Sequence, residues 1–302
     1  MDRIFFSYIP NSARIAFHGL LEELFRRCFL TQRRRDAECA ESDLNWGCAP
    51  RVELALGDSA SLGGYPDPKK TVNPVNPVQN DSASLRLCVN NIPRFGEVAV
   101  KDAKFRTFIA DAAARREFYK HVYDVTYGLV KKDDTLVVLD DSIVRGNTMK
   151  NAILPMLDRL GPKRIVIASS APPIRYPDCY GIDMSTLGEL VAFRALVNLL
   201  GDGANDLLHE ALMGNAENPL EALYAKFAEE QHAAEIARLL TPPDIKAEVV
   251  VVYQTVEDLR RCLGGENIGD WYFTGDYPTP GGYKVLRKAL LNYLDKRNDR
   301  SY

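Results

Sequence analysis

Residues 137–148 read VVLDDSIVRGNT, and no other segment of this 302-residue chain limits the possible folds as strongly. An apolar run ends there in two adjacent acids, Asp140 and Asp141, and a loop of small and polar residues follows. Apolar residues then recur at helical spacing over 149–160, and the next apolar run covers 165–168. A strand, a loop, a helix and a second strand in this order predict a parallel β-sheet with helices packed against it.

Other segments extend the pattern to an α/β fold. The apolar run 4–9 predicts a first strand, and the spacing after Ser12 predicts a helix. Helical patterns fill 187–240, a late strand is predicted at 249–252, and the last helix is expected to end near Lys296.

Residues 31–95 interrupt this order. The segment contains paired glycines, several prolines and two Asp-Ser-Ala-Ser copies. Such a composition buries too little apolar surface to offset the entropy lost on ordering, so we expect a mobile insertion. The expected organisation is a core domain at 1–200 that contains this insertion, followed by a helical C-terminal region at 201–302.

The acid pair and its loop predict a phosphate-sugar site. Ligands of open α/β sheets bind where the parallel strands end. Loop amides and a helix N-terminus can hold a phosphate, Gly146 allows close backbone approach, and Thr148 adds a hydroxyl. Asp140 and Asp141 suit ribose hydroxyls or a hard cation. The loop lacks the spacing of a Walker motif, and the alternative is that the acids only cap a strand and a helix.

Composition narrows the class of protein. A net charge of −3 and a pI near 5.9 argue against sequence-independent binding to nucleic acid. No apolar run reaches the roughly 18 residues of a membrane span, and the start does not read as a signal peptide, so a cytoplasmic protein without membrane contact is expected. The six cysteines and four histidines are scattered, which gives no support for a zinc or iron–sulfur site.

The 137–148 string resembles the 5-phosphoribosyl-1-pyrophosphate (PRPP) loop of type I phosphoribosyltransferases, and its DDSIVRG form resembles the amidophosphoribosyltransferases. Further segments are similar to motifs of that family, in the wording typical of Bacteroidetes-like bacteria: Pro10-Asn11-Ser12 of the pyrophosphate loop, RTFI at 106–109, APPIRYP at 171–177 with YGID at 180–183, and FTGDYP at 273–278. The resemblance covers nearly all of the chain outside the insertion.

The resemblance implies a type I phosphoribosyltransferase fold with a helical C-terminal region. It implies conversion of PRPP and ammonia to 5-phosphoribosylamine and pyrophosphate, the first step of purine nucleotide synthesis, with Mg²⁺ as the cofactor. Asp140, Asp141 and Ser12 would bind the metal, and the two acids would also hold the ribose hydroxyls. Arg106 would be catalytic, at the start of a lid that reaches about residue 132. The remaining implied PRPP contacts are Asn11, Ser142, Ile143, Val144, Arg145, Gly146, Asn147 and Thr148.

The sequence departs from the family in several places. Asp2 stands where a catalytic cysteine would open a glutaminase domain, so glutamine hydrolysis is expected from a domain or subunit outside this chain, in a homo-oligomer. Asn11 and Asn147 replace the family's aspartate and threonine, and Pro155 predicts a kink in the following helix. The alternatives are a nucleobase phosphoribosyltransferase, a PRPP-binding regulator without catalysis, and an inactive fragment.

Overall fold

The structure is a computed structural model that describes residues 4–10, 13–26, 94–101, 123–182, 184–264, 268–297 and 299–301. The chain divides into two compact units, one formed by 1–23 with 93–302 and one by 24–92. The account that follows concerns the first unit. Of the expected insertion at 31–95, only Arg94 and Phe95 are among the described residues.

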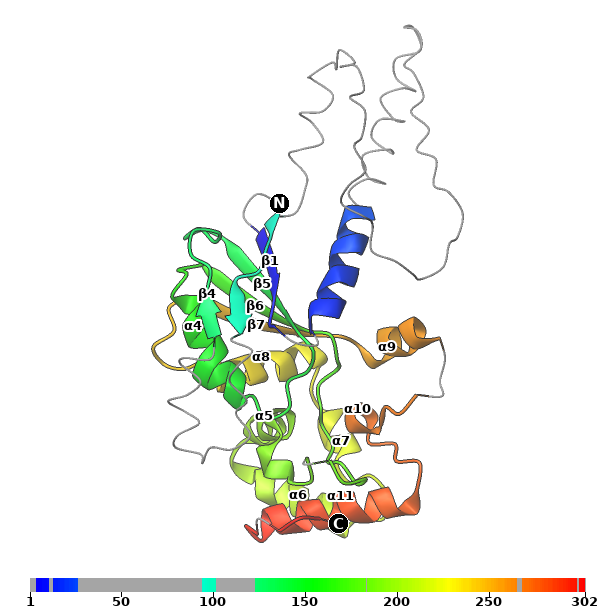
Figure 1. The fold of residues 1–302 in the computed structure, drawn as a ribbon. Helices are drawn as coiled ribbons and strands as arrows, with labels where there is room; N and C mark the ends of the chain where they lie inside the picture. Colours follow the sequence, from blue (N-terminus) through cyan, green and yellow to red (C-terminus); the bar gives the residue numbers. More distant parts are fainter. Residues whose placement is uncertain are drawn as a thin grey trace, which may run out of the picture. The chain divides into compact units, whose positions relative to one another are not determined.

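Five parallel strands form the sheet at the centre of this unit (Figure 1). Its spatial order is β2 (Arg94–Phe95), β1 (Ile4–Tyr8), β5 (Thr135–Asp140), β6 (Arg164–Ser169) and β7 (Glu248–Tyr253). A separate antiparallel pair consists of β3 (Ala99–Lys101) and β4 (Tyr123–Val125). The parallel α/β architecture predicted from the sequence is therefore confirmed.

The central strands are apolar because helices bury them. Leu136 and Val138 of β5 are fully buried, as are Ile165 and Ile167 of β6. Strands of parallel sheets are normally covered by their crossover helices, which is why they appear in sequence as nearly continuous apolar runs. This first core also includes residues of the helices that follow β5 and of two later helices: Met149, Ile153, Leu154, Leu157, Val191, Ala192, Ala195, Ile236, Ala237 and Leu240.

The helix that follows β5 is irregular where Pro155 stands. A π-helical turn at Met149–Ile153 passes directly into α4 (Leu154–Asp158), and the Leu154 N–H donates to the Met149 carbonyl. Pro155 lies in the first turn of α4, where a missing N–H does least harm. The departure from regular helix is thus a wide turn directly before the proline.

Helices dominate the chain after β6. Five of them, α5, α6, α7, α10 and α11, contribute to a second core, and Figure 1 shows α6 and α11 side by side, away from the strands. Two of the helices after β6, α9 and α10, were not predicted from the sequence. The helices are α5 (Val191–Leu200), α6 (Ala204–Met213), α7 (Glu221–Tyr224), α8 (Glu229–Leu240), α9 (Val256–Leu263), α10 (Trp271–Thr274) and α11 (Pro280–Leu294), with short 3₁₀ turns at Leu187–Glu189 and Gly201–Gly203.

Among the described residues, no helix combines the length and the apolar character needed to cross a membrane.

Candidate functional site

The acid pair lies at the carboxyl end of β5, where the sequence places it. Asp140 is the last residue of the strand, and Asp141 is the first residue beyond it. The segment after β6 holds both backbones. Ser170 N–H donates to the Asp140 carbonyl at 2.9 Å, and Ala171 N–H donates to the Asp141 carbonyl at 3.1 Å. The Ser170 hydroxyl lies 3.2 Å from each of these two carbonyl oxygens.

The two carboxylates face different surroundings. The pKa of Asp140 is raised to about 7, first by burial and second by the neighbouring charge of Asp141, while a hydrogen bond from the Asp141 N–H acts in the opposite direction. That N–H lies 3.0 Å from Asp140 Oδ1, and the Ser142 N–H lies 2.8 Å from Asp141 Oδ1. A nearby cation would favour the ionised form of Asp140 and relieve the repulsion. Two adjacent carboxylates of this kind fit a hard divalent ion such as Mg²⁺.

The loop that follows the acids is shaped at Gly146. This residue has φ +75°, a conformation that side chains rarely adopt, and a Cβ built on it would collide with the Leu240 side chain. The chain is helical from residue 147, and Lys150 N–H donates to the Gly146 carbonyl at 2.9 Å. The N–H groups of the first helical turn have no partner within the helix. Asn147 and Thr148 are exposed at this end, so the loop and helix start can accept an anion.

Residues far along the chain fix the loop. Arg145 donates from Nε to Glu189 at 2.8 Å, and Arg194 donates to the Arg145 carbonyl at 2.9 Å. The Val191 N–H, at the start of α5, donates to the Val144 carbonyl at 2.9 Å. Hydrogen bonds from α5 and from the turn before it thus hold the middle residues of the loop, Val144 and Arg145, in place beyond the acid pair.

Glu189, Arg194 and Ser170 were not identified from the sequence. The position of Ser170 could have been predicted, because it follows the strand predicted at 165–168 and the ends of neighbouring parallel strands lie at the same edge of a sheet. Glu189 and Arg194 lie 44 and 49 residues from Arg145, and nothing local marks them.

Three of the residues expected in the site, Asn11, Ser12 and Arg106, lie outside the described residues. The same holds for the expected lid at 106–132 except for its last part, 123–132. Across the described parts of the chain, no group of three or more histidine, cysteine, aspartate or glutamate side chains is arranged to hold a metal. The acid pair supplies two carboxylates toward such a site.

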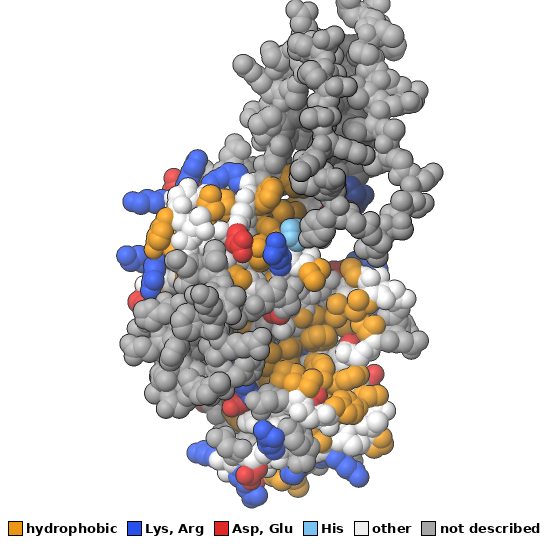
Figure 2. Space-filling model, viewed as in Figure 1, with side chains coloured by type: hydrophobic (Ala, Val, Ile, Leu, Met, Phe, Trp, Pro, Cys, Tyr) orange, Lys and Arg blue, Asp and Glu red, His pale blue; other side chains and the backbone are white. Residues whose placement is uncertain are grey.

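The segments 171–177 and 273–278 meet each other in the second core. The Tyr277 hydroxyl donates to the Pro177 carbonyl at 2.6 Å, and directly before the second segment the Tyr272 carbonyl accepts from the Arg175 and Tyr176 N–H groups at 2.9 and 3.1 Å. Figure 2 shows hydrophobic side chains gathered on this face of the molecule, over α7 and α10. Hydrogen bonds and apolar packing therefore hold these two segments together.

Comparison with known proteins gives a consistent result. The chain is 38% identical over 156 residues to the amidophosphoribosyltransferase of Pasteurella multocida, which is 49% of this chain and 31% of that protein. It is 39% identical over 95 residues to the Escherichia coli protein of the same name (29% and 19%), and 49% identical over 63 residues to the one from Pyrococcus horikoshii (21% and 14%). The matches span less than a third of the length of these relatives.

Solved structures include a glutamine PRPP amidotransferase from B. subtilis complexed with ADP and GMP. It is 25% identical, with a TM-score of 0.39, and covers 67% of this chain and 37% of its own. No family model matches the chain. Sequence identities of 35–49% over these lengths make the chain a homologue of amidophosphoribosyltransferases, over part of their length.

Proposed function

We propose that this chain is a phosphoribosyltransferase of the amidophosphoribosyltransferase type. It would bind PRPP at the acid pair and its loop and replace pyrophosphate with ammonia to give 5-phosphoribosylamine. The observation that carries this proposal is the arrangement at the end of β5: two carboxylates, a glycine loop packed on Leu240, and a helix start that can accept an anion.

Different residues would contact the sugar, the metal and the phosphate. Asp140 and Asp141 would hold the ribose hydroxyls and, with Ser12, would bind Mg²⁺. The 5-phosphate lies in the cradle from Ser142 to Thr148, where backbone N–H groups and the helix dipole stabilise its charge. The bound ion would supply Lewis-acid stabilisation of the leaving pyrophosphate.

The chemistry is a displacement at the sugar carbon that carries pyrophosphate. Bond cleavage builds positive charge on the ribose ring and negative charge on pyrophosphate, so no covalent nucleophile is needed. Asp140 and Asp141 orient the ring beneath this carbon. Arg106 is proposed to offset the charge on the departing group, and the segment 106–132 is proposed as the lid that excludes water.

The same proposal covers organisation and partners. Residues 1–200 form the phosphoribosyltransferase core, interrupted at 31–95, and 201–302 complete it as a helical region. Ammonia would come from a glutaminase domain or subunit, within a homo-oligomer in the cytoplasm. These points rest on the resemblance of the motifs and on the homologues, which are proteins named amidophosphoribosyltransferases.

The acid pair gives the direct test. Calorimetry of PRPP binding with magnesium should show at least a hundredfold weaker affinity for Asp140→Asn/Asp141→Asn, since each charge-assisted contact is worth roughly 1.5–3 kcal/mol. Asp202→Asn/Asp206→Asn removes two exposed carboxylates elsewhere and should bind as the wild type does. Equal affinity in both double variants would remove the acid pair from the site.

Turnover separates the proposal from its alternatives. Wild-type protein incubated with PRPP, magnesium and ammonium should release pyrophosphate faster than without ammonium. Release that requires a nucleobase instead would identify a nucleobase phosphoribosyltransferase. Tight PRPP binding without release under either condition would indicate a PRPP-binding regulator or an inactive fragment.

A further inference from the structure

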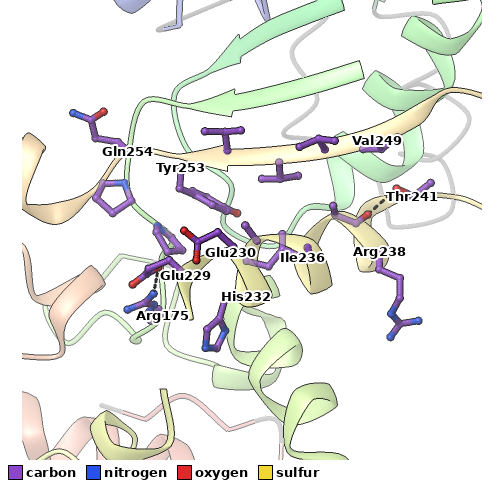
Figure 3. Close-up of a pocket in the computed structure, with 18 of the residues that line it drawn as sticks. Arg175, Glu229, Glu230, His232, Ile236, Arg238, Thr241, Val249, Tyr253 and Gln254 are labelled. Atoms are coloured by element: carbon purple, nitrogen blue, oxygen red, sulfur yellow. Dashed lines mark hydrogen bonds and ion pairs between the residues drawn. The ribbon is translucent and has the colours of Figure 1, made fainter. Parts of the chain in front are cut away.

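A cavity lies beside β7, the edge strand of the sheet. Its volume is about 1010 Å³, and it is bounded by α8, β7 and the segment that follows β6 (Figure 3). Most of its lining is apolar and includes Ile236 and Ala237 from α8, Val249 from β7, and Pro172 and Phe273. A cavity of this size and character can take a small molecule of ordinary metabolite or cofactor size.

The wall of this cavity contains one buried polar group without a partner. The Tyr253 ring is half-buried, and its hydroxyl is buried and has no hydrogen-bond partner among the described residues. Figure 3 shows this hydroxyl directed from β7 towards α8, across the space that the lining encloses. A buried hydroxyl without a partner costs about 1–3 kcal/mol. An acceptor that reached it would recover that free energy.

The two arginines at the cavity already have partners. Arg175 forms an ion pair with Glu229 at 2.5 Å, and its guanidinium also lies over the Tyr224 ring. Arg238 forms an ion pair with Glu235 at 2.6 Å. Burial lowers the pKa of His232, so this ring is neutral at pH 7. A negatively charged ligand would have to displace the carboxylate partner of one of these arginines, whereas an uncharged ligand would not.

We propose that this cavity binds an uncharged, largely apolar small molecule that carries a carbonyl-type acceptor. The apolar body lies between α8 and β7, and the Tyr253 hydroxyl donates to the acceptor. The acid pair lies on the same edge of the sheet, because Tyr253 is in register with Ser169, and Ser169 with Asp140. One helix borders both places, since α8 lines the cavity and its Leu240 contacts the loop at Gly146.

Two naphthalenes that differ only at the acceptor test this assignment. 2-Acetylnaphthalene has a carbonyl where 2-ethylnaphthalene has a methylene. Each would be titrated against protein loaded with 2-acetyl-6-(dimethylamino)naphthalene, a fluorescent ketone whose emission shifts to the blue in apolar surroundings. On the wild type, the ketone should compete about three- to tenfold better than the hydrocarbon, the range expected for one neutral hydrogen bond.

Two variants assign this difference to the cavity. Tyr253→Phe removes only the hydroxyl, so it should abolish the preference for the ketone and leave 2-ethylnaphthalene unaffected. Ala234→Trp, at an exposed position of α8 that lines the cavity, should weaken both compounds at least tenfold. Ala222→Trp, at an exposed position of α7 away from the cavity, is the matched control and should bind as the wild type does.

The opposite results are equally clear. A ketone preference that survives Tyr253→Phe, or binding that Ala234→Trp leaves intact, would overturn the assignment. A blue shift that Ala222→Trp abolishes as strongly as Ala234→Trp would also overturn it. None of these measurements uses PRPP, so failure here and failure of the proposed transferase activity can be told apart.

Discussion

At the scale of single residues, Gly146 decides how closely the loop after the acid pair approaches α8. Its positive φ excludes most side chains, and Leu240 occupies the space where a Cβ would stand. Leu240 is itself buried at 1% exposure, so it has little room to move aside. Backbone conformation and packing therefore require glycine at this position for separate reasons.

Gly128 allows these two reasons to be measured separately. It also has positive φ, at +86°, but a Cβ there would meet nothing within 4 Å. Gly128→Ala should lower the free energy of unfolding by about 1–2 kcal/mol through backbone strain alone. Gly146→Ala should cost about 1–3 kcal/mol more, because Leu240 must repack. Urea unfolding gives both values, and equal losses of unfolding free energy would show that the Leu240 side chain moves aside at no cost.

His232 predicts how stability depends on pH. Burial lowers its pKa in the folded protein, with the Arg175 charge as a second cause. Below about pH 6.5, the unfolded chain therefore binds a proton that the folded chain resists, and stability is lost as the pH falls through this range. Wild-type protein should lose stability from about pH 7 to about pH 5 more steeply than His232→Gln in urea unfolding.

A surface histidine gives the control for this slope. His209 is exposed on α6, and His209→Gln should keep the wild-type pH dependence. If His232→Gln and the wild type lose stability in parallel, the buried ring is not the group that responds to acid.

At the scale of elements, two distant segments depend on Asp178. This carboxylate is fully buried and accepts from the Tyr272 hydroxyl at 2.7 Å, from Tyr180 N–H at 2.9 Å and from Ile182 N–H at 2.6 Å. It thereby joins α10 to the segment after β6, 94 residues away. Because it has several donors, the carboxylate can remain buried without a cation beside it.

Two tyrosines provide a matched pair for this contact. Tyr272 and Tyr283 each donate a hydroxyl to an aspartate Oδ1, but the partner of Tyr272 is buried and Asp276, the partner of Tyr283, is exposed. Tyr272→Phe should cost about 1–3 kcal/mol of unfolding free energy, since Asp178 loses a donor that water cannot replace. Tyr283→Phe should cost less than about 0.5 kcal/mol. Similar costs would mean that water reaches Asp178.

These elements also show how far the sequence could predict the fold and the site. Strands β5 and β6 were predicted because each is an apolar run bounded by polar residues, and the position of the acid pair followed from the end of β5. Helix α10 has four residues and stops at Gly275, where a Cβ would collide with Tyr176. Its conformation is set by packing against a segment about a hundred residues away, and the spacing of apolar residues along the sequence contains no information on such a contact.

The contacts that hold the candidate site were less predictable for the same reason. The acids and the loop are consecutive, so one local pattern shows them together. Glu189 and Arg194 act on Arg145 only after α5 has packed against the loop. The segments at 171–177 and 273–278 were noted in the sequence only as resembling family motifs, and the fold shows that they contact each other.

At the scale of the whole unit, α5 belongs to both hydrophobic cores. Val191, Ala192 and Ala195 lie in the core beneath the sheet, whereas Phe193 and Leu196 lie in the second core. The Phe193 ring meets Tyr293 of α11 edge-on, with 4.8 Å between ring centroids. A helix that covers only one core has an apolar stripe and a polar face, but α5 has apolar residues on opposite sides.

This position between two cores has a consequence for how the chain tolerates mutation. In a library of all single substitutions selected for folded protein, the first six positions of α5 should admit almost no charged residue except at Arg194. Helix α9, which has no buried residue, should accept charges along its length. If charged residues were instead accepted in α5 at every third or fourth position, one of the two cores would contribute little to folding.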